Sequence, residues 1–504
     1  MEIHDAGIAE LQAAMCGGRL SAAELAGYCL DRIARLDRSG PRLGAVVEVN
    51  PDAPAIAEAL DDERRRGRAR GPLHGIPVLL KDNIDTADRL MTTAGSLALV
   101  GPPASLDAGV VARLRVVGAV VLGKTNLSEW ANFRSRRSTS GWSARGGQTK
   151  NPHVLDRNPS GSSSGSAAAV AAGFAPCALG TETDGSIVSP ANACGVVGIK
   201  PTVGFTSRGG VIPIAYSQDS VGPLARTVAD AAVVLGAIAG LDPRDPASAW
   251  APTAVDFRRC LDPEGLRGAR LGVLRADIER IPASAPVVEE ALRALRAAGA
   301  VVVDPLVLPT AEELRADDSE FEVMLHEFHA GLDAYLARRR GLPVRNLSEV
   351  IAFNEAHAAR ELAHFGQEVL EAAAARGPLD QDAYRAALGR SRVLAGPRGI
   401  DALLDGHHLD ALIAPTAGPA VVTDLEHGTR QGHGSSSPAA RAGYPLISVP
   451  AGFRGPLPVN ITFMGRARSE STLIRLAHAF EQTTRARRPP RWLPAAPTGT
   501  CQAF

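Results

Sequence analysis

The sequence has 504 residues, 45% of them apolar, which is enough for one large domain or several ordinary ones with full cores. Lysine plus arginine and aspartate plus glutamate balance at 54 each. This balance gives no charged surface of the kind that binds nucleic acid or an anionic membrane, and we expect neither partner.

The cysteines and the N-terminal residues indicate in which cellular compartment the protein is located. None of the six cysteines forms a CxxC pair, and six in a chain of this length do not make a disulfide scaffold. The N-terminal residues have no basic region before an apolar run and do not resemble a signal peptide. The longest stretch of small apolar residues, 167–179, is too short to span a bilayer. The sequence therefore predicts a cytoplasmic protein.

The pattern of apolar residues changes along the chain. It begins with helical spacing, and Ser21 and Glu24 form a capping box for one of these helices. Short apolar runs that alternate with helical patterns follow. The predicted segments are N-terminal helices (1–65), a core of strands and helices (66–305), a helical region (306–405), strands with a closing helix (406–484), and a solvated C-terminal tail (485–504).

Strands that alternate with helices predict an α/β fold whose sheet is covered by helices on both faces. We expect a single large domain over residues 1–490. Because the helices of residues 306–405 stand between strands in the sequence, we expect them to form a cap inserted over the sheet.

The glycine- and serine-rich stretch NPSGSSSGS, residues 158–166, has several interpretations. Alone it is typical of a flexible linker. No GK[ST] follows the glycines, which excludes a P-loop. The stretch matches G-x-S-x-G with Ser163 as nucleophile, but the preceding NPHVLDRNP cannot be the central strand that a nucleophile elbow requires. A small-residue helix and a strand follow at once, which favours a built loop over a linker.

Lys81 ends the apolar run GIPVLLK, and Ser186 follows the acidic turn TETDG. A serine hydroxyl needs a base to become a nucleophile, and a lysine in water, with a pKa near ~10.4, is protonated at neutral pH. Burial at a strand end lowers the pKa of a lysine. On position alone, a surface lysine that extends its amine into solvent remains an equal alternative.

The ordered motifs GPLHGIPVLLKDNID, LGKTNLSEW, GSSSGSAAAVAAG, GTETDGSI and GVVGIKPT resemble the amidase signature family. Within that family the chain looks most like the bacterial peptide amidases, by NFRS, SGWSARGGQT and the helical stretch EFEVMLHEFHAGLDAYL. The resemblance spans the chain from the first helices to the last. It implies a single domain with a central mixed, twisted β-sheet covered by helices on both faces.

The resemblance also implies a Ser–cis-Ser–Lys triad. Ser186 would be the nucleophile, Ser162 the bridging serine with a cis peptide bond before it, and Lys81 the base. Ser163 would line the site and help to hold the lysine. Neutral Lys81 would take a proton from Ser162, which takes one from Ser186, and the relay would reverse to protonate the leaving amine.

The turn before the nucleophile departs from the family pattern. The backbone N–H groups expected to form the oxyanion hole belong to Thr183, Asp184, Gly185 and Ser186. Asp184 replaces a glycine, so we expect its backbone N–H to serve the oxyanion, whereas its carboxylate would be unhelpful there unless it points away. Asn460 also stands where the family commonly has glycine, which puts the local substrate-side geometry in question.

The remaining candidates have supporting roles. Thr181 is expected on the substrate side, and Asp219 and Arg226 in a polar network near the site. His326 and His329 lie three residues apart, but without a third ligand or an HExxH motif a solvated helical face is favoured over a metal site. We expect neither a metal nor a cofactor.

The predicted activity is hydrolysis of a carboxamide to a carboxylate and ammonia through an acyl-enzyme, with the C-terminal amide of a peptide as a narrower version. The partner would be a small-molecule or short-peptide amide, and the protein a monomer or homodimer. Alternatives are acyl transfer to an amine, the ammonia-donating subunit of a tRNA amidotransferase, and an inactive scaffold. We expect the cap helices and the loops 91–96, 132–142 and 435–438 to line the pocket.

Overall fold

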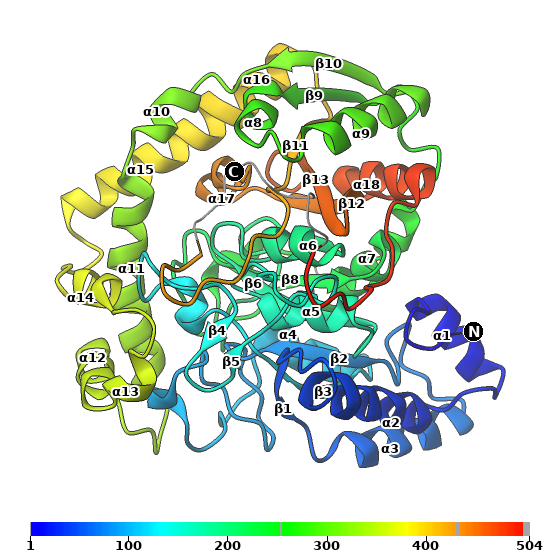
Figure 1. Ribbon diagram of the computed structural model, residues 1–504, viewed down its shortest axis with the longest axis vertical. Helices are drawn as coiled ribbons and strands as arrows, with labels where there is room; N and C mark the ends of the chain where they lie inside the picture. The colour runs from blue at the N-terminus through cyan, green and yellow to red at the C-terminus, as the bar shows by residue number, and fades with distance from the viewer. Residues whose placement is uncertain (1, 253–254, 430–433, 497–504) are drawn as a thin grey trace.

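The computed structural model describes residues 2–252, 255–429 and 434–496 (Figure 1). Its centre is an eleven-stranded sheet with the order β1-β3-β2-β6-β8-β7-β12-β13-β11-β9-β10. The strands are β1 (Val46–Val49), β2 (Pro77–Lys81), β3 (Val120–Thr125), β6 (Cys177–Glu182), β7 (Val197–Lys200), β8 (Ser220–Ala225), β9 (Arg270–Leu274), β10 (Val301–Leu306), β11 (Ala411–Pro415), β12 (Leu446–Arg454) and β13 (Leu457–Met464). A separate hairpin pairs β4 (Trp142–Ser143) with β5 (Gly147–Gln148).

The sheet is mixed, as predicted. Strand β2 runs parallel to both β3 and β6, and β9 runs parallel to β10 and β11. The strands between these two parallel groups pair antiparallel. Every residue of β2, β6 and β8 is buried, which is typical of strands covered on both faces.

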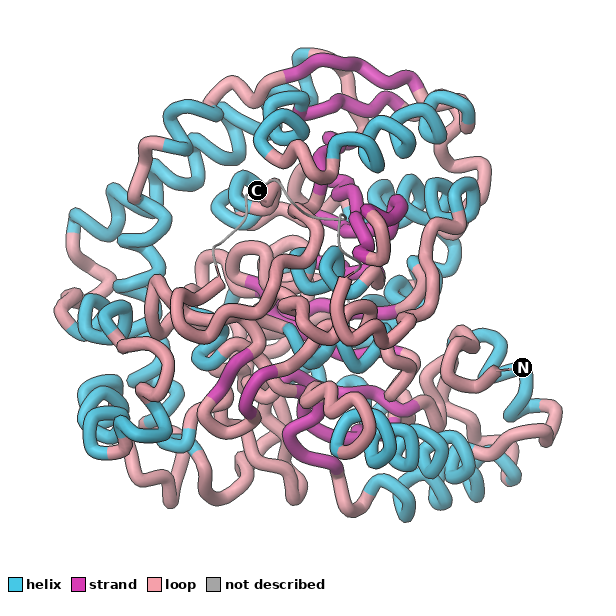
Figure 2. Tube along the Cα trace, in the orientation of Figure 1, coloured by secondary structure: helices cyan, strands magenta, loops and turns pink. Residues whose placement is uncertain are grey.

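Helices lie on both sides of the band of strands (Figure 2). They are α1 (Ile8–Cys16), α2 (Ala22–Ile33), α3 (Ala53–Arg65), α4 (Gly109–Val116), α5 (Ser164–Ala171), α6 (Val188–Cys194), α7 (Val228–Ile238), α8 (Arg275–Arg280), α9 (Ala285–Ala297), α10 (Ala311–Arg315), α11 (Ser319–Leu336), α12 (Leu347–Ala356), α13 (Ala358–Glu361), α14 (Glu368–Ala374), α15 (Asp382–Ala395), α16 (Ala402–Gly406), α17 (Ser437–Ala442) and α18 (Glu470–Thr484). The predicted capping box at α2 is present, since Ser21 and Glu24 cap each other's backbone N–H groups.

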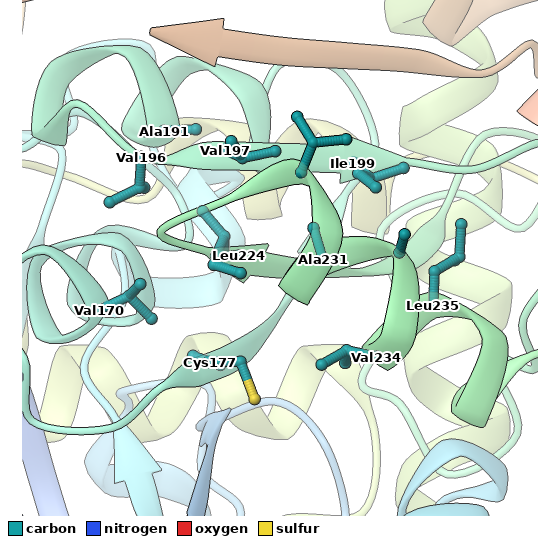
Figure 3. Packing of buried hydrophobic residues seen from close by; sticks show 14 of the residues in the cluster. Val170, Cys177, Ala191, Val196, Val197, Ile199, Leu224, Ala231, Val234 and Leu235 are labelled. Carbon is teal, nitrogen blue, oxygen red and sulfur yellow. The ribbon is translucent and has the colours of Figure 1, made fainter. Parts of the chain in front are cut away.

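The main core forms where α5 and α7 meet the middle of the sheet (Figure 3). Val170 of α5, Cys177 of β6 and Leu224 of β8 are all fully buried there. All eight residues of α5 are buried, and seven of them are serine, glycine or alanine. Small side chains let this helix lie close to its neighbours, and a Cβ on Gly165 would stand 2.3 Å from Ala45 O.

The helices α10 to α16 follow β10 and precede β11, and α11 and α14 contribute to a second apolar cluster with Trp130 and Phe133 of the core. The segment boundaries drawn from the sequence stay a prediction. Part of the C-terminal segment differs from the expected solvated tail. Trp492 and Leu493 donate backbone hydrogen bonds to Pro152 and His153, so the described part of this segment packs on the core.

One buried ion cluster ties α13 to the core. Arg134 donates to Glu129, to Glu361 O (2.6 Å) and to Phe365 O (3.2 Å), and none of the three charged side chains is exposed. Glu361 in turn accepts from the backbone N–H of Leu97 (2.6 Å). Among the described helices none is both long and apolar enough to cross a membrane.

Replacement of Arg134 by methionine should destabilise the protein strongly. Two buried carboxylates would lose their cation, and such unpaired burial costs about 3–5 kcal/mol. The matched control is Arg293→Met, which removes an exposed pair with Glu290 and should change the free energy of unfolding by less than about 1 kcal/mol. Urea denaturation measures both, and equal small effects would contradict the anchoring role of Arg134.

Candidate active site

The sheet brings Lys81 to the strand that precedes Ser186. Strands β2 and β6 are parallel neighbours with Leu80 opposite Leu179, so the end of β2 lies beside Thr181. Lys81 Nζ lies 2.7 Å from Ser162 Oγ, 2.9 Å from Thr181 Oγ1 and 3.2 Å from Thr181 O. Lys81 is completely buried, which excludes the alternative of a solvent-reaching surface lysine.

These three contacts suit both protonation states of the amine. An ammonium donates to all three oxygens, whereas a neutral amine donates to the two oxygens of Thr181 and offers its lone pair to the hydroxyl proton of Ser162. Burial lowers the pKa of Lys81 to about 7, while the carboxylates of Asp219 and Glu182 act in the opposite direction. Lys81 can therefore accept a proton near neutral pH.

The glycine- and serine-rich loop is a built part of the core and no linker. Ser162, Ser163 and Ser164 are all fully buried, and the peptide bond between Gly161 and Ser162 is cis. A Cβ on Gly161 would stand 2.2 Å from Ser128 Oγ, so only glycine fits there. The N–H of Ser163 donates to Ser186 O (3.0 Å), which joins this loop to the segment that carries Ser186.

Ser163 differs from its predicted role. Its hydroxyl donates to Thr181 O (3.1 Å) and accepts from Thr181 N (3.3 Å), and no hydrogen bond joins it to Lys81. It therefore acts on the lysine only through Thr181, which itself holds the amine. The same contacts occupy Ser163 Oγ deep in the core, which argues against its use as the nucleophile of a G-x-S-x-G elbow.

The turn between β6 and α6 contains the four residues predicted to form the oxyanion hole, and Ser186 is the last of them. Gly185 has a φ of 77°, a conformation that glycine adopts without strain. Glu182 Oε2 accepts from the N–H groups of Ile187 (2.6 Å) and Val188 (3.0 Å), so it fixes the far end of the turn. Ser186 is 8% exposed and lines a cavity, so it can meet a substrate.

Asp219 supports the near end of this turn. Its carboxylate accepts from Thr183 Oγ1 and from the backbone N–H groups of Ile214 (2.9 Å) and Ala215 (3.0 Å). Burial raises the pKa of Asp219 to about 6, against these hydrogen bonds. The Asp184 side chain accepts from Ser436 Oγ on the wall of the cavity.

Arg226 does not belong to this network. It follows the last residue of β8, whereas Asp219 precedes the first, so the length of the strand separates them. Arg226 donates to the carbonyls of Ala6 (2.7 Å) and Ala175 (3.0 Å). The expected role of Arg226 near the site is therefore wrong. Asp219 and Arg226 are close in sequence, but the extended strand β8 lies between them and holds them apart.

Asn460 and the two helical histidines have structural contacts. Asn460 is fully buried in β13, where its amide donates to Val196 O and Ser448 Oγ, both at 2.9 Å. Asn460 does not line the cavity, but Asn192, which accepts a hydrogen bond from the backbone N–H of Asn460, does. His326 and His329 each contact a backbone carbonyl after α14. Over the described residues, no cluster of histidine, cysteine or acidic side chains could hold a metal ion.

The cavity in front of Ser186 has a volume of about 510 Å³. Its wall includes Asn132, Phe133 and Ser140, Met324 of α11, and Ser436 and Ser437, in line with two of the three predicted loops. Residues 91–96 are absent from the wall. The prediction missed residues 280–283 and 417–421, which line it, because loops that follow a helix or a strand carry no motif that announces a site.

Asn83 is a site residue that the sequence analysis missed. Its amide donates to Thr181 Oγ1 (3.0 Å), the same oxygen that accepts from Lys81. Asn83 stands two residues after Lys81 in the motif KDN, and this spacing could have indicated that it lies in the site. The contact fixes the Thr181 hydroxyl as an acceptor for the amine.

Comparison with known proteins agrees with this geometry. The amidase family model matches residues 24–474. A probable amidase of Arabidopsis thaliana is 44% identical over 500 residues, which cover 97% of this chain and 92% of the relative. A glutamyl-tRNA(Gln) amidotransferase subunit of Chloroflexus aurantiacus is 35% identical over 494 residues, 96% of this chain and 97% of its own.

Solved structures give the same result. The native peptide amidase of Stenotrophomonas maltophilia superposes with a TM-score of 0.92 at 54% identity, over 97% of this chain and 99% of that one. Peptide amidase PAM in complex with the competitive inhibitor chymostatin gives 0.94 at 55% identity, again over 97% and 99%. The chain therefore belongs to the amidase signature family and is an amidase, a hydrolase of amide carbon–nitrogen bonds.

Proposed function

We propose that this amidase removes the C-terminal amide of short peptides, with Ser186 as nucleophile, Ser162 as bridge and Lys81 as base. The observation that carries the proposal is the fully buried lysine amine, whose Nζ lies 2.7 Å from Ser162 Oγ. A neutral amine in contact with a serine hydroxyl is what a hydrolase without histidine needs to activate its nucleophile.

In the proposed reaction Ser186 Oγ attacks the carboxamide carbon and gives its proton to Ser162, while Ser162 gives its own to Lys81 Nζ. The N–H groups of the turn 183–186 would receive the negative oxygen. The proton then passes from Lys81 through Ser162 to the nitrogen of the carboxamide. Ammonia departs, and the acyl group stays bound to Ser186 as an ester. Water hydrolyses the ester by the same relay and releases the carboxylate.

The cavity supports a peptide as the substrate. A volume of about 510 Å³ is in the range of sites that hold molecules larger than a simple amide. Polar groups of Asn132, Asn158 and Ser160 stand among apolar side chains such as Phe133 and Met324, a mixture that suits a peptide backbone with apolar side chains. Similarity to the peptide amidases supports the same substrate class.

We also propose a cytoplasmic location and a monomer or homodimer. The five cysteines within the described residues are free thiols, and three of them are buried. We further propose that residues 1–490 form one domain, in which the helices of residues 306–405 act as a cap. Met324 of this region lies on the cavity wall, in support of a role in substrate recognition.

Replacement of Ser186 by alanine should abolish hydrolysis of an N-blocked dipeptide amide. Loss of a serine nucleophile typically lowers kcat by about 10⁶-fold, and ammonia release measures it. The control is Ser39→Ala, an exposed serine whose hydroxyl bonds only to the preceding turn. Full activity in Ser186→Ala would refute the triad. Ammonia release from glutamine but not from the peptide amide would favour an amidotransferase subunit.

The pH dependence should report the amine of Lys81. Only the neutral form can act as base, so kcat/KM should fall about tenfold per pH unit below about 7 and lose this dependence on Lys81 above it. An ordinary lysine would be neutral in fewer than about one molecule in a thousand at pH 7.

Lys81→Arg keeps a permanent charge and should be inactive at every pH. Lys150→Arg, at a partly exposed lysine outside the cavity, is the matched control. If Lys81→Arg stayed active and its kcat/KM still fell below about pH 7, that fall would belong to another group and not to Lys81.

A further inference from the structure

Two carboxyl groups that the proposed reaction does not use lie beside the oxyanion turn. Asp184 belongs to the turn, and Glu320 lies in the first turn of α11. The two side chains are in contact, and each is only partly exposed. Two carboxylates this close repel each other, so the contact favours a proton on one of them.

Each carboxyl has its own further partner. Ser436 Oγ donates to Asp184, while Gln218 Nε2 (2.9 Å) and Ser437 Oγ (3.3 Å) donate to Glu320. Gln218 Nε2 also lies 3.5 Å from Thr183 O. The pair therefore connects α11, α17 and the oxyanion turn at one point on the cavity wall.

The surroundings decide how many protons the pair keeps. The cations that face it are Arg441 of α17 and Lys200 of β7. Arg441 is already paired with Asp317, so the pair is not fully neutralised. Burial and the neighbouring Asp184 raise the pKa of Glu320 to about 8. Burial also raises the pKa of Asp184, against the hydrogen bond from Ser436.

We propose that Glu320 is a positioning residue for catalysis, which donates its proton to Asp184 and thereby turns that carboxylate away from the reacting oxygen. The backbone N–H of Asp184 is then free to face the oxyanion, and the pair carries one negative charge. This inference rests on the oxyanion role proposed for the turn 183–186.

Loss of the shared proton should weaken catalysis. Two carboxylates in contact repel each other, and a second negative charge beside the turn opposes the charge that develops on the substrate oxygen. The effect belongs to the transition state, so kcat should fall while KM changes little. Lys200, whose pKa burial lowers to about 8, would titrate in the same range, so the test must separate the two groups.

The experiment compares wild type, Glu320→Gln and Glu322→Gln on an N-acetylated dipeptide amide from pH 5 to 10, with the released acid measured by chromatography. The glutamine at 320 can still donate to Asp184 but cannot lose a proton. Glu322→Gln is the matched control, two residues along the same helix, where the carboxylate pairs with Arg376. Wild type and Glu322→Gln should lose kcat about tenfold per pH unit well above pH 8.

In Glu320→Gln the alkaline decline should disappear, the acid limb of Lys81 should stay, and kcat at pH 7 should remain within about threefold of wild type. An unchanged alkaline decline would overturn the inference and point to Lys200. A uniform loss at every pH in Glu320→Gln alone would also overturn it, since that result indicates a structural role.

A second variant, Glu320→Ala, removes the donor and should lower kcat at pH 7 by about tenfold or more with KM within about twofold. Equal kcat in Glu320→Ala and wild type would overturn the inference. Failure of the proposed function gives a different result, because Ser186→Ala would then keep its activity or wild type would release no acid from the peptide amide.

Discussion

The site depends on the removal of one amine from water. Lys81 ends a strand whose residues are all buried, and its side chain has no exposed surface. The free energy that a charged ammonium would lose on burial appears as a lowered pKa. The sheet itself supplies that burial, since the neighbouring strands β3 and β6 and the helix α5 surround β2. The packing of the fold thus produces an amine that can be neutral near pH 7, which is what the proposed role of Lys81 as base requires.

The oxygens around the amine are positioned by backbone as much as by side chains. Thr181 O belongs to a strand, and its position is fixed by the ladder between β6 and β8. Ser162 precedes the first turn of α5, and Ser163 bonds both to Thr181 and to the backbone of Ser186. Three chain segments from different parts of the sequence are therefore locked into one register by main-chain hydrogen bonds.

Much of this arrangement follows from the sequence. Alternating apolar runs and helical patterns predict the α/β sheet, and the motifs around Lys81, Ser162 and Ser186 predict which segments meet. Contacts that depend on the exact path of the chain were not predictable. Arg226 follows Asp219 closely in sequence, yet an extended strand places them at opposite ends of β8. Glu320 lies in a region without a motif, and only the docking of α11 brings it to Asp184.

The all-buried helix α5 has a consequence for how this protein can change. A side chain larger than its serines, glycines and alanines would collide with the neighbouring backbone, as the distance of 2.3 Å from a Cβ on Gly165 to Ala45 O shows, and so disturb the packing around the proposed base and nucleophile. Much of the cavity wall, by contrast, is built from loops and from α11, which lie outside this tightly packed centre, and α6 adds Ser189, Asn192 and Ala193. Mutation and selection can therefore alter which amide enters while the chemistry stays constant, so new substrates are reached through the rim and not through the centre.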